Sequence, residues 1–261
     1  MSVAHVTRPN AFAQSLGIAI GCVEMNLRLD TEQLHGAIAK RYAAFTSGSK
    51  QPVEIQVTSD DASVLTPAEF ECDFDAARLQ ARASGVRFSG VKNEYAMDSL
   101  LRMFLSWELL SRTGFLLHAA TVVRDGRAYV FTGRSGAGKS TVASLSPAGS
   151  VLTDEISLLR KESGEWRAYG TPFWGEFRAA GSNTSAPVAG IFQLVQAKVN
   201  EAKGLPKLEF LRVLLTNILF FSKAAKDHNR LLEIAAVAAG EIPGHVLRFQ
   251  KARKFWEAVP Q

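Results

Sequence analysis

Apolar and polar residues follow two regular patterns along the chain, and each pattern predicts one kind of element. Strict alternation, as in Val23–Leu29, is typical of a strand that buries one face. Apolar residues three or four positions apart, as in the segment after Asp30, are typical of an amphipathic helix. In the first part of the chain these patterns predict two short strands within 17–29, a helix that begins at 30, strands at 52–57 and 86–95, and a helix at 98–112. Residues 60–84 show no clear period and are expected to be mostly irregular.

The pattern changes after residue 112, where longer apolar segments begin. Phe115–Val123 is almost continuously apolar, which predicts a buried strand, and the pair Asp125-Gly126 predicts a tight turn into an antiparallel strand at 127–132. Further strands are expected at 150–160, 165–173, 188–195 and 244–249, and helices at 140–145, 206–221, 227–239 and 252–259. We therefore predict a mixed α/β fold, with an N-terminal α+β region at residues 1–112 and a second domain at residues 113–261.

The composition is that of a globular protein. Of the 261 residues, 47% are apolar, which is enough for a large core. Cys22 and Cys72 are the only cysteines and lie in no metal-binding or redox motif, so a reducing compartment is expected. The most apolar long window, 210–221, contains Arg212 and is too short to span a bilayer. The first residues lack the apolar segment of a signal peptide, so none is expected there. We expect a soluble cytoplasmic protein without a membrane partner.

The net charge of +5 comes largely from the C-terminal part of the chain. Basic residues after position 197 include Lys198, Lys203, Lys207, Lys223, Lys226, Arg230, Arg248, Lys251, Arg253 and Lys254. They can attract an anionic partner, or they can form the solvated faces of C-terminal helices, which is the favoured interpretation. Because no basic motif with interleaved aromatic residues is present, nucleic acid is not an expected partner.

A glycine-rich segment directly after the strand predicted at 127–132 carries the clearest chemistry. Its sequence is Gly-Arg-Ser-Gly-Ala-Gly-Lys-Ser-Thr, and it leads into a predicted helix, which is the context of a phosphate-binding loop. Glycines let the backbone curl so that successive amide groups point at phosphate oxygens. Lys139 can then reach the β- and γ-phosphates of ATP, and the hydroxyl of Ser140 can bind Mg²⁺. The residues expected to bind the nucleotide are Gly133, Arg134, Ser135, Gly136, Ala137, Gly138, Lys139, Ser140 and Thr141. An ordinary glycine-rich turn is the alternative.

Two carboxylates follow the loop closely. Asp154 and Glu155 end a predicted strand fifteen residues beyond Lys139. Adjacent side chains of a strand point to opposite faces, so both reach one site only if the backbone bends there or if one acts through a water molecule. Asp154 is expected to hold Mg²⁺ together with Ser140, and Glu155 to accept the proton of an attacking hydroxyl or water. The alternative is an acidic pair that only solvates the strand end.

A histidine lies in the strand that precedes the predicted hairpin. His118 stands twenty-one residues before Lys139, on the strand expected to pair with the one that leads into the loop. It can therefore approach the phosphates or the base as a catalytic residue, or it can be a hydrogen-bonded core histidine. The sequence leaves both possibilities open.

Together these segments resemble the catalytic domain of HPr kinase/phosphorylase and its relatives, which include HPr-kinase-like proteins encoded with ribosomally made peptides. The segments that carry the resemblance are Leu117–Ala120, Gly133–Ser140, Thr153–Glu155 and Tyr169–Gly175. The resemblance covers roughly residues 113–259 and implies a fold shared with phosphoenolpyruvate carboxykinase, in which the histidine, the loop and the acidic pair form the site. In ABC, AAA and GTPase proteins the acidic motif usually lies much further along the chain.

The chain departs from this family at two points. The family has two aspartates where this chain has Asp154-Glu155, so the base would be a longer side chain. The glutamate–arginine–glycine segment of the bifunctional enzymes has no clear counterpart, although Glu176 or Arg178 could substitute for it. The resemblance therefore implies neither the reverse phosphorylase activity nor HPr as the substrate.

These observations predict an ATP- and Mg²⁺-dependent kinase that transfers a phosphoryl group to a hydroxyl, with a serine of a peptide or protein as the expected acceptor. A nucleotide- or phosphate-binding regulatory module without transfer activity and a small-molecule or carboxykinase-like enzyme are the alternatives. Thr171, Trp174 and the polar segment 181–187 either contact the acceptor or are surface turns. The sequence leaves open the identity of the acceptor and whether the protein forms oligomers.

Overall fold

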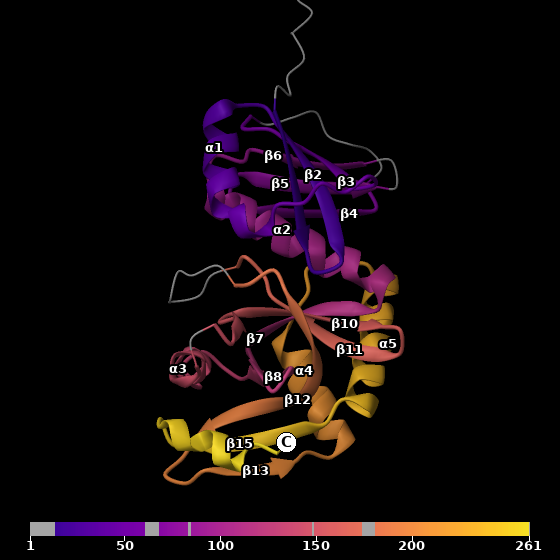
Figure 1. The fold of residues 1–261 in the computed structure, drawn as a ribbon. Coiled ribbons are helices and arrows are strands. Elements are labelled where there is room, and N and C mark those ends of the chain that lie inside the picture. The colour runs from indigo at the N-terminus through magenta and orange to yellow at the C-terminus, as the bar shows by residue number, and fades with distance from the viewer. Residues whose placement is uncertain (1–13, 61–67, 83–84, 148, 174–180, 261) are drawn as a thin grey trace, which may run out of the picture. The chain divides into compact units, whose positions relative to one another are not determined.

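The computed structural model describes residues 14–60, 68–82, 85–147, 149–173 and 181–260. These residues form a mixed α/β fold, as the sequence predicts, and their strands make two β-sheets (Figure 1). They divide into two compact units. The N-terminal unit contains the described residues of 14–18 and 24–100, and the C-terminal unit contains those of 19–23 and 101–260.

The N-terminal unit is built on a six-stranded sheet with the order β1-β2-β3-β6-β5-β4. Its elements are β1 (Gln14–Ile20), β2 (Val23–Leu29), α1 (Glu32–Arg41), η1 (Ala43–Phe45), β3 (Val53–Val57), β4 (Phe70–Phe74), β5 (Ala77–Arg82), β6 (Gly85–Ser89) and the first part of α2 (Glu94–Glu108). Strands β2, β3 and β6 are parallel, and β5 is antiparallel to both of its neighbours. Helix α1 begins where the Thr31 side chain accepts a hydrogen bond of 3.3 Å from the Leu34 amide, as an N-cap residue does.

The prediction that residues 60–84 are mostly irregular is wrong. Strands β4 and β5 form an antiparallel hairpin there, with Phe70 opposite Ala81. The alternation is hard to detect because several positions on the apolar face hold small residues, among them Cys72 and Ala77. Short strands with weakly apolar inward positions therefore escape a search for strong period-two patterns.

The strand predicted at 86–95 is shorter than expected. It ends at Ser89 because the chain turns at Gly90, whose φ of +68° favours glycine. A Cβ atom at Gly90 would lie 2.4 Å from the carbonyl oxygen of Ala76, so the turn also needs the close approach of two backbones. Helix α2 then begins at Glu94, four residues before the predicted start.

The C-terminal unit is built on a nine-stranded sheet. Its main order is β11-β10-β7-β8-β12-β15-β13, and β9 and β14 also pair with β7. The strands are β7 (Gly114–Arg124), β8 (Arg127–Thr132), β9 (Val151–Thr153), β10 (Ile156–Glu162), β11 (Glu165–Tyr169), β12 (Ser185–Gln196), β13 (Glu201–Gly204), β14 (Ile218–Leu219) and β15 (Gly244–Phe249). Strands β8, β12 and β15 are parallel, so their carboxyl ends meet at one edge of the sheet. The predicted hairpin is confirmed, since β7 and β8 pair antiparallel and Asp125 and Gly126 both have positive φ in the turn.

Helices and apolar side chains cover both faces of this sheet. The helical elements of the C-terminal unit, besides the end of α2, are η2 (Leu109–Arg112), α3 (Lys139–Leu145), α4 (Lys207–Asn217), α5 (Ala225–Glu241) and η3 (Arg253–Ala258). Val130 and Phe131 are adjacent in β8 and belong to two different buried clusters, one with Phe210 and Ile234 and one with Phe249. Burial on both faces explains the nearly continuous apolar sequence of the central strands.

The strand predicted at 150–160 is interrupted. Strands β9 and β10 both pair antiparallel with β7, and Asp154 and Glu155 lie between them. The strand predicted at 165–173 ends at Tyr169, and the last predicted helix is a 3-10 helix. Strands β13 and β14 were not predicted, because segments of four and two residues are too short to show a period.

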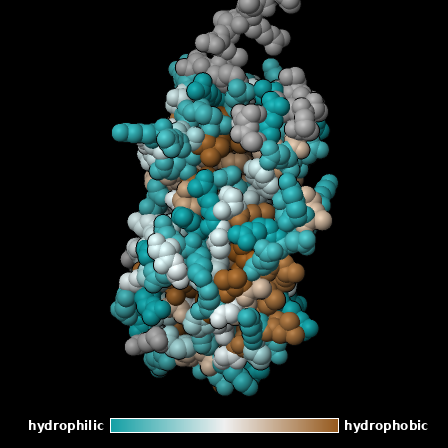
Figure 2. All heavy atoms as spheres, turned by 90° about the vertical axis from the view of Figure 1, so that its right-hand side faces the viewer, coloured by the Kyte–Doolittle hydropathy of each residue, from teal (hydrophilic) through white to brown (hydrophobic). Residues whose placement is uncertain are grey.

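Some apolar side chains of the C-terminal unit are exposed. Leu208 and Leu215 on α4 and Leu232 and Val237 on α5 have exposed fractions between 40% and 62%. Figure 2 shows hydrophobic atoms gathered on this unit, on the side where α5 lies in Figure 1. In the part of the chain that the structure describes, no helix combines the length and the apolar character needed to cross a bilayer.

Candidate functional site

Residues of the glycine-rich loop, the acidic pair and His118 line one pocket of the C-terminal unit. The pocket has a volume of about 600 Å³. Its lining residues are His118, Ser135, Gly136, Gly138, Lys139, Ser140, Thr141, Asp154, Glu155 and Lys251. The loop follows the carboxyl end of β8, and Lys251 follows that of the parallel strand β15. Ligands of open α/β sheets commonly bind outside these strand ends.

The loop between β8 and α3 is held in a curled shape by two neighbouring strand ends. Gly133, Gly136 and Gly138 have φ angles of +150°, +76° and +114°, which favour glycine. A Cβ atom at Gly138 would lie 2.5 Å from Cζ of the buried Phe249 at the end of β15. The Nε2 atom of Gln196, at the end of β12, donates a hydrogen bond of 2.6 Å to the carbonyl oxygen of Gly136. The loop therefore depends on glycine both for its φ angles and for its close packing.

Lys139 lies against the inside of this curl. It is the first residue of α3 and is only 8% exposed. Its Nζ atom donates hydrogen bonds to the carbonyl oxygens of Gly133, at 2.9 Å, and Arg134, at 3.2 Å. Ser140 and Thr141 follow and are half-buried in the pocket wall. A cation beside a curled, glycine-rich backbone suits an anionic ligand.

Asp154 and Glu155 both reach the pocket because the backbone leaves the ladder between β9 and β10. Asp154 is buried, with 7% of its surface exposed, and Glu155 is half-buried. The carbonyl oxygen of Glu155 accepts a hydrogen bond of 2.9 Å from the amide of Ala119 on β7. The bend that two adjacent carboxylates require in order to share a site is therefore present.

Buried hydroxyl groups fix this bend. The carbonyl oxygen of Ile156 accepts hydrogen bonds from Oγ1 of Thr171, at 2.6 Å, and from Oγ1 of Thr153, at 3.1 Å. Thr171 is fully buried, and its own carbonyl oxygen accepts a hydrogen bond from the Gly181 amide. Thr171, a candidate for contact with the acceptor, is therefore a structural residue that supports the acidic pair.

His118 is half-buried in β7, beside the start of the loop. Its carbonyl oxygen accepts a hydrogen bond of 2.9 Å from Oγ1 of Thr132, the last residue of β8. Burial lowers the pKa of His118 below its ordinary value, and the positive charges of Lys139 and Arg102 lower this pKa further. The imidazole is therefore neutral at neutral pH and can accept a proton or a hydrogen bond.

Lys251 is a pocket residue that the sequence did not identify. The sequence grouped it with the solvated charges of the C-terminal segment, and it is indeed exposed. It follows β15 in a turn where the amide of Gln250 donates a hydrogen bond of 2.8 Å to Oδ1 of Asn200. Only the parallel pairing of β15 with β12 brings this turn to the loop, and no local motif signals such a pairing.

Not every predicted site residue lines the pocket. Gly133, Arg134 and Ala137 shape the loop instead, and the amide of Ala137 donates a hydrogen bond of 3.0 Å to the carbonyl oxygen of Arg134. The described residues of 181–187 are absent from the pocket lining, and Pro187 lies in β12. Trp174, Glu176 and Arg178 lie outside the described residues.

The chemistry of Ser140 and Asp154 fits a bound Mg²⁺ ion. Both line the same pocket, and hydroxyl and carboxylate oxygens are the ligands that Mg²⁺ prefers. Among the residues with described positions, no group of three or more His, Cys, Asp and Glu could hold a metal ion on its own. Because Mg²⁺ commonly takes only one or two protein oxygens and completes its shell with water and substrate phosphates, these residues suit an ion that arrives with a phosphate ligand.

Comparisons with known proteins identify the family. The structure of the Hpr(Ser) kinase/phosphatase from Coxiella burnetii is similar to part of the chain, with 14% sequence identity, a TM-score of 0.28, and coverage of 48% of this chain and 89% of that chain. No curated protein matches the chain. The family model described as SynChlorMet cassette protein ScmC matches residues 95–261, which is well over half of the chain and includes every residue that lines the pocket. The matching model is thus that of ScmC rather than that of HPr kinase itself, and the chain belongs to the ScmC family of SynChlorMet cassette proteins.

Proposed function

We propose that residues 113–261 form a P-loop domain of the type found in HPr kinase and phosphoenolpyruvate carboxykinase, and that this domain is an ATP- and Mg²⁺-dependent kinase. The acceptor that we propose is a hydroxyl group, a serine of a peptide or protein. One observation carries the proposal: a single pocket is lined by the glycine-rich loop, by Lys139 and Ser140, by both carboxylates and by His118.

The loop and Lys139 are the groups proposed to hold the phosphates of ATP. Backbone amides of a curled glycine-rich segment donate to phosphate oxygens, and Lys139 adds a positive charge from the same side of the pocket. Ser140 and Asp154 would hold Mg²⁺. When bound there, this ion supplies charge that neutralises the phosphate oxygens during transfer. Pre-placed charges of this kind stabilise the transition state more than the bound substrate.

Glu155 is the residue proposed as the base. In the transfer step, the acceptor oxygen forms a bond to the γ-phosphorus, the bond from that phosphorus to the β–γ bridging oxygen breaks, and ADP leaves. The proton of the hydroxyl passes to the Glu155 carboxylate. The bend before β10 supports this role because it lets Glu155 and Asp154 enter the pocket together. His118, neutral and on the neighbouring strand β7, is proposed to accept a hydrogen bond from the reacting groups.

A nucleotide-binding regulatory module without transfer activity is the second candidate. The observation that favours it is the position of the Lys139 ammonium group, which is bonded to two carbonyl oxygens of its own loop. A kinase has to redirect this group towards the phosphates, whereas a module that responds to nucleotide can use the same change as its signal. The two candidates differ in whether a phosphorylated product forms.

Incubation of the purified protein with γ-labelled ATP, Mg²⁺ and lysate of the native host tests the proposal. We expect label in a peptide or protein fraction, lost in Lys139→Ala and retained in Lys254→Ala, which removes an exposed lysine that does not line the pocket. Calorimetry on the same variants measures ATP binding separately, and thermal melts check that they are folded.

The outcomes separate the candidates. Label only in small molecules would contradict a peptide or protein acceptor and favour a small-molecule kinase. Binding of ATP without any labelled product would favour the regulatory module. The absence of ATP binding would contradict both.

A further inference from the structure

The sheet of the N-terminal unit has one apolar and one polar face. In β2, Met25, Leu27 and Leu29 are buried, whereas Arg28 between them is exposed. The same alternation continues in β3 and β6, where Ile55, Val57, Val86 and Phe88 are buried and Glu54, Gln56 and Arg87 point to the other side. These three neighbouring strands, β2, β3 and β6, therefore share a polar face.

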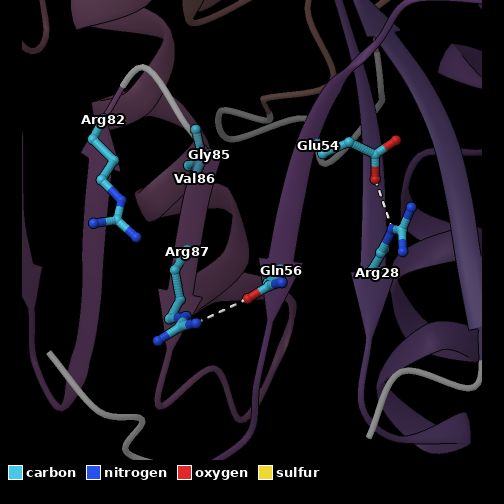
Figure 3. A pocket seen from close by; sticks show the side chains of 7 residues that line it. All are labelled: Arg28, Glu54, Gln56, Arg82, Gly85, Val86 and Arg87. Carbon is cyan, nitrogen blue, oxygen red and sulfur yellow. Dashed lines mark hydrogen bonds and ion pairs between the residues drawn. The ribbon is translucent and has the colours of Figure 1, made fainter. Parts of the chain in front are cut away.

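This polar face contains a small hollow, separate from the pocket of the C-terminal unit (Figure 3). Its volume is about 220 Å³. It is lined by Arg28, Glu54, Gln56, Arg82, Gly85, Val86 and Arg87. Figure 3 shows Arg82 and Arg87 on one side of the hollow, the Arg28–Glu54 pair on the other, and Gln56 between them.

Pairing between strands sets the spacing of the arginines. Gln56 is the direct partner of both Arg28 on β2 and Arg87 on β6, so the three side chains form a row across the sheet. Adjacent strands are about 4.8 Å apart, which places the two arginines of the row on strands about 10 Å apart. Arg82 on β5 is the partner of Gly85, and a Cβ atom built on Gly85 meets no atom within 4 Å. The space between Arg82 and Arg87 is therefore open.

The hollow carries an excess of positive charge. Among the described residues that line it are three arginines and one carboxylate. Glu54 forms an ion pair with Arg28, at 2.7 Å, and Arg87 donates a hydrogen bond of 3.0 Å to Oε1 of the neutral Gln56. Within the described residues, the guanidinium group of Arg82 makes neither an ion pair nor a hydrogen bond. The described lining therefore holds more arginines than carboxylates, and Arg82 has no carboxylate partner in it.

We propose that this hollow is a binding site for carboxylate groups of an acidic peptide segment. A guanidinium group offers parallel N–H donors that match the two oxygens of a carboxylate. Arg82 and Arg87 are diagonal neighbours, and their Cβ atoms are therefore about 7 Å apart, which is also the distance between alternate residues of an extended peptide. The carboxamide of Gln56 adds a donor and an acceptor for the backbone of that peptide.

Several features favour a peptide over a nucleotide or a nucleic acid. The lining residues that the structure describes include no aromatic side chain on which a base could stack. Glu54 would repel a continuous line of phosphates, whereas a peptide with separated carboxylates can avoid it. The hollow is also much smaller than the pocket of about 600 Å³ in the C-terminal unit. Its size suits one or two side chains rather than a nucleoside.

Fluorescence anisotropy with the full chain and a labelled peptide of alternating glutamate and serine tests this site. We expect binding that weakens with added salt, and at least about tenfold weaker binding for the double variant Arg82→Gln with Arg87→Gln, because two charge-assisted contacts are lost. Arg78→Gln is the matched control. Arg78 lies on the same face of β5 but outside the hollow, and it forms an ion pair of 2.7 Å with Asp73.

Glu54→Gln gives a test that a folding defect cannot imitate. Removal of the carboxylate from the lining is expected to strengthen peptide binding several-fold, because one repulsive charge is lost and Arg28 is released. The proposal would be overturned if a peptide of glutamine and serine bound equally well, or if a single-stranded oligonucleotide or inorganic phosphate bound more tightly. It would also be overturned if the Arg82/Arg87 variant bound the acidic peptide with unchanged affinity. The test requires no phosphoryl transfer, and Lys139→Ala is expected to bind the peptide normally. The expected peptide binding is therefore the same whether or not the proposed kinase function is correct.

Discussion

The amide of Ala119 donates a hydrogen bond of 2.9 Å to the carbonyl oxygen of Glu155. This bond ties the acidic pair to β7 at the residue next to His118, although the pair itself lies outside the strand ladder. The Glu155 backbone is therefore held by a bond that does not involve its carboxylate. A substitution that keeps the side-chain shape should remove the chemistry and leave the geometry in place.

Glu155→Gln is accordingly expected to keep nucleotide binding and to lower the rate of phosphoryl transfer by about 10²–10⁴-fold, the usual loss for a general base. Asp154→Asn should act differently, because it removes a proposed Mg²⁺ ligand, and should raise the Mg²⁺ concentration needed for half-maximal transfer. Calorimetry with ATP and initial rates across a Mg²⁺ series measure both effects. A Glu155→Gln protein that transfers at the normal rate would show that another group accepts the proton.

Most elements of this fold could be predicted because their patterns are local. The N-cap at Thr31, the Asp125-Gly126 hairpin and the near-continuous apolar sequence of β7 all depend on residues close to one another in the chain. The hairpin of β4 and β5 was missed because small residues such as Ala77 and Ala81 replace strong apolar ones at inward positions. Tertiary packing, rather than propensity, makes these segments strands.

The candidate site was predictable where one motif or one strand end supplies the residues. The loop, the acidic pair and the need for a bend follow from spacing and side-chain alternation. Lys251 and the bracing of the loop by Gln196 and Phe249 were not predictable. They require knowledge that β12 and β15 run parallel to β8, and non-local pairing has no signature in a single sequence.

The pH dependence of stability should reveal the environment of His118. Its pKa in the folded protein lies below the ordinary value of 6.5, so on acidification the unfolded chain takes up a proton before the folded chain does. The free energy of unfolding is therefore expected to fall as the pH drops below about 6.5, down to the lowered pKa of the folded state. Urea denaturation of the nucleotide-free protein at several pH values measures this slope.

In His118→Gln the loss of stability over the same pH range should be smaller. Some slope should remain, because burial also lowers the pKa of His245. His245→Gln is the matched control and should reduce the slope independently. An identical pH dependence of the His118→Gln protein and the unsubstituted protein would contradict the described surroundings of His118.

Lys251→Ala should weaken nucleotide binding without affecting the fold. The side chain is exposed and lines the pocket from the turn after β15, so its loss leaves no cavity. If it contacts a phosphate, the loss of one hydrogen bond between charged groups, worth about 1.5–3 kcal/mol, should weaken ATP binding by about 10- to 100-fold. Lys254→Ala, which removes an equally positive residue from outside the pocket, should bind ATP normally. If the two variants bind ATP with equal affinity, Lys251 is a solvated surface charge that does not contact the nucleotide.

Gly138→Ala should damage the loop more than Gly136→Ala does. Both glycines have positive φ, so alanine at either position costs about 1–2 kcal/mol of backbone strain. At Gly138 the new Cβ would also lie 2.5 Å from Cζ of Phe249, a fully buried ring that packs edge-to-face against Phe255, whereas at Gly136 it would meet no atom within 4 Å. Overpacking of this kind adds about 1–3 kcal/mol, so urea denaturation should show clearly lower stability for Gly138→Ala. If the two variants lose the same stability, the contact between the loop and Phe249 does not constrain the loop. If the double variant Gly138→Ala with Phe249→Leu recovers stability, the overlap with the Phe249 ring is the cause of the larger loss in Gly138→Ala.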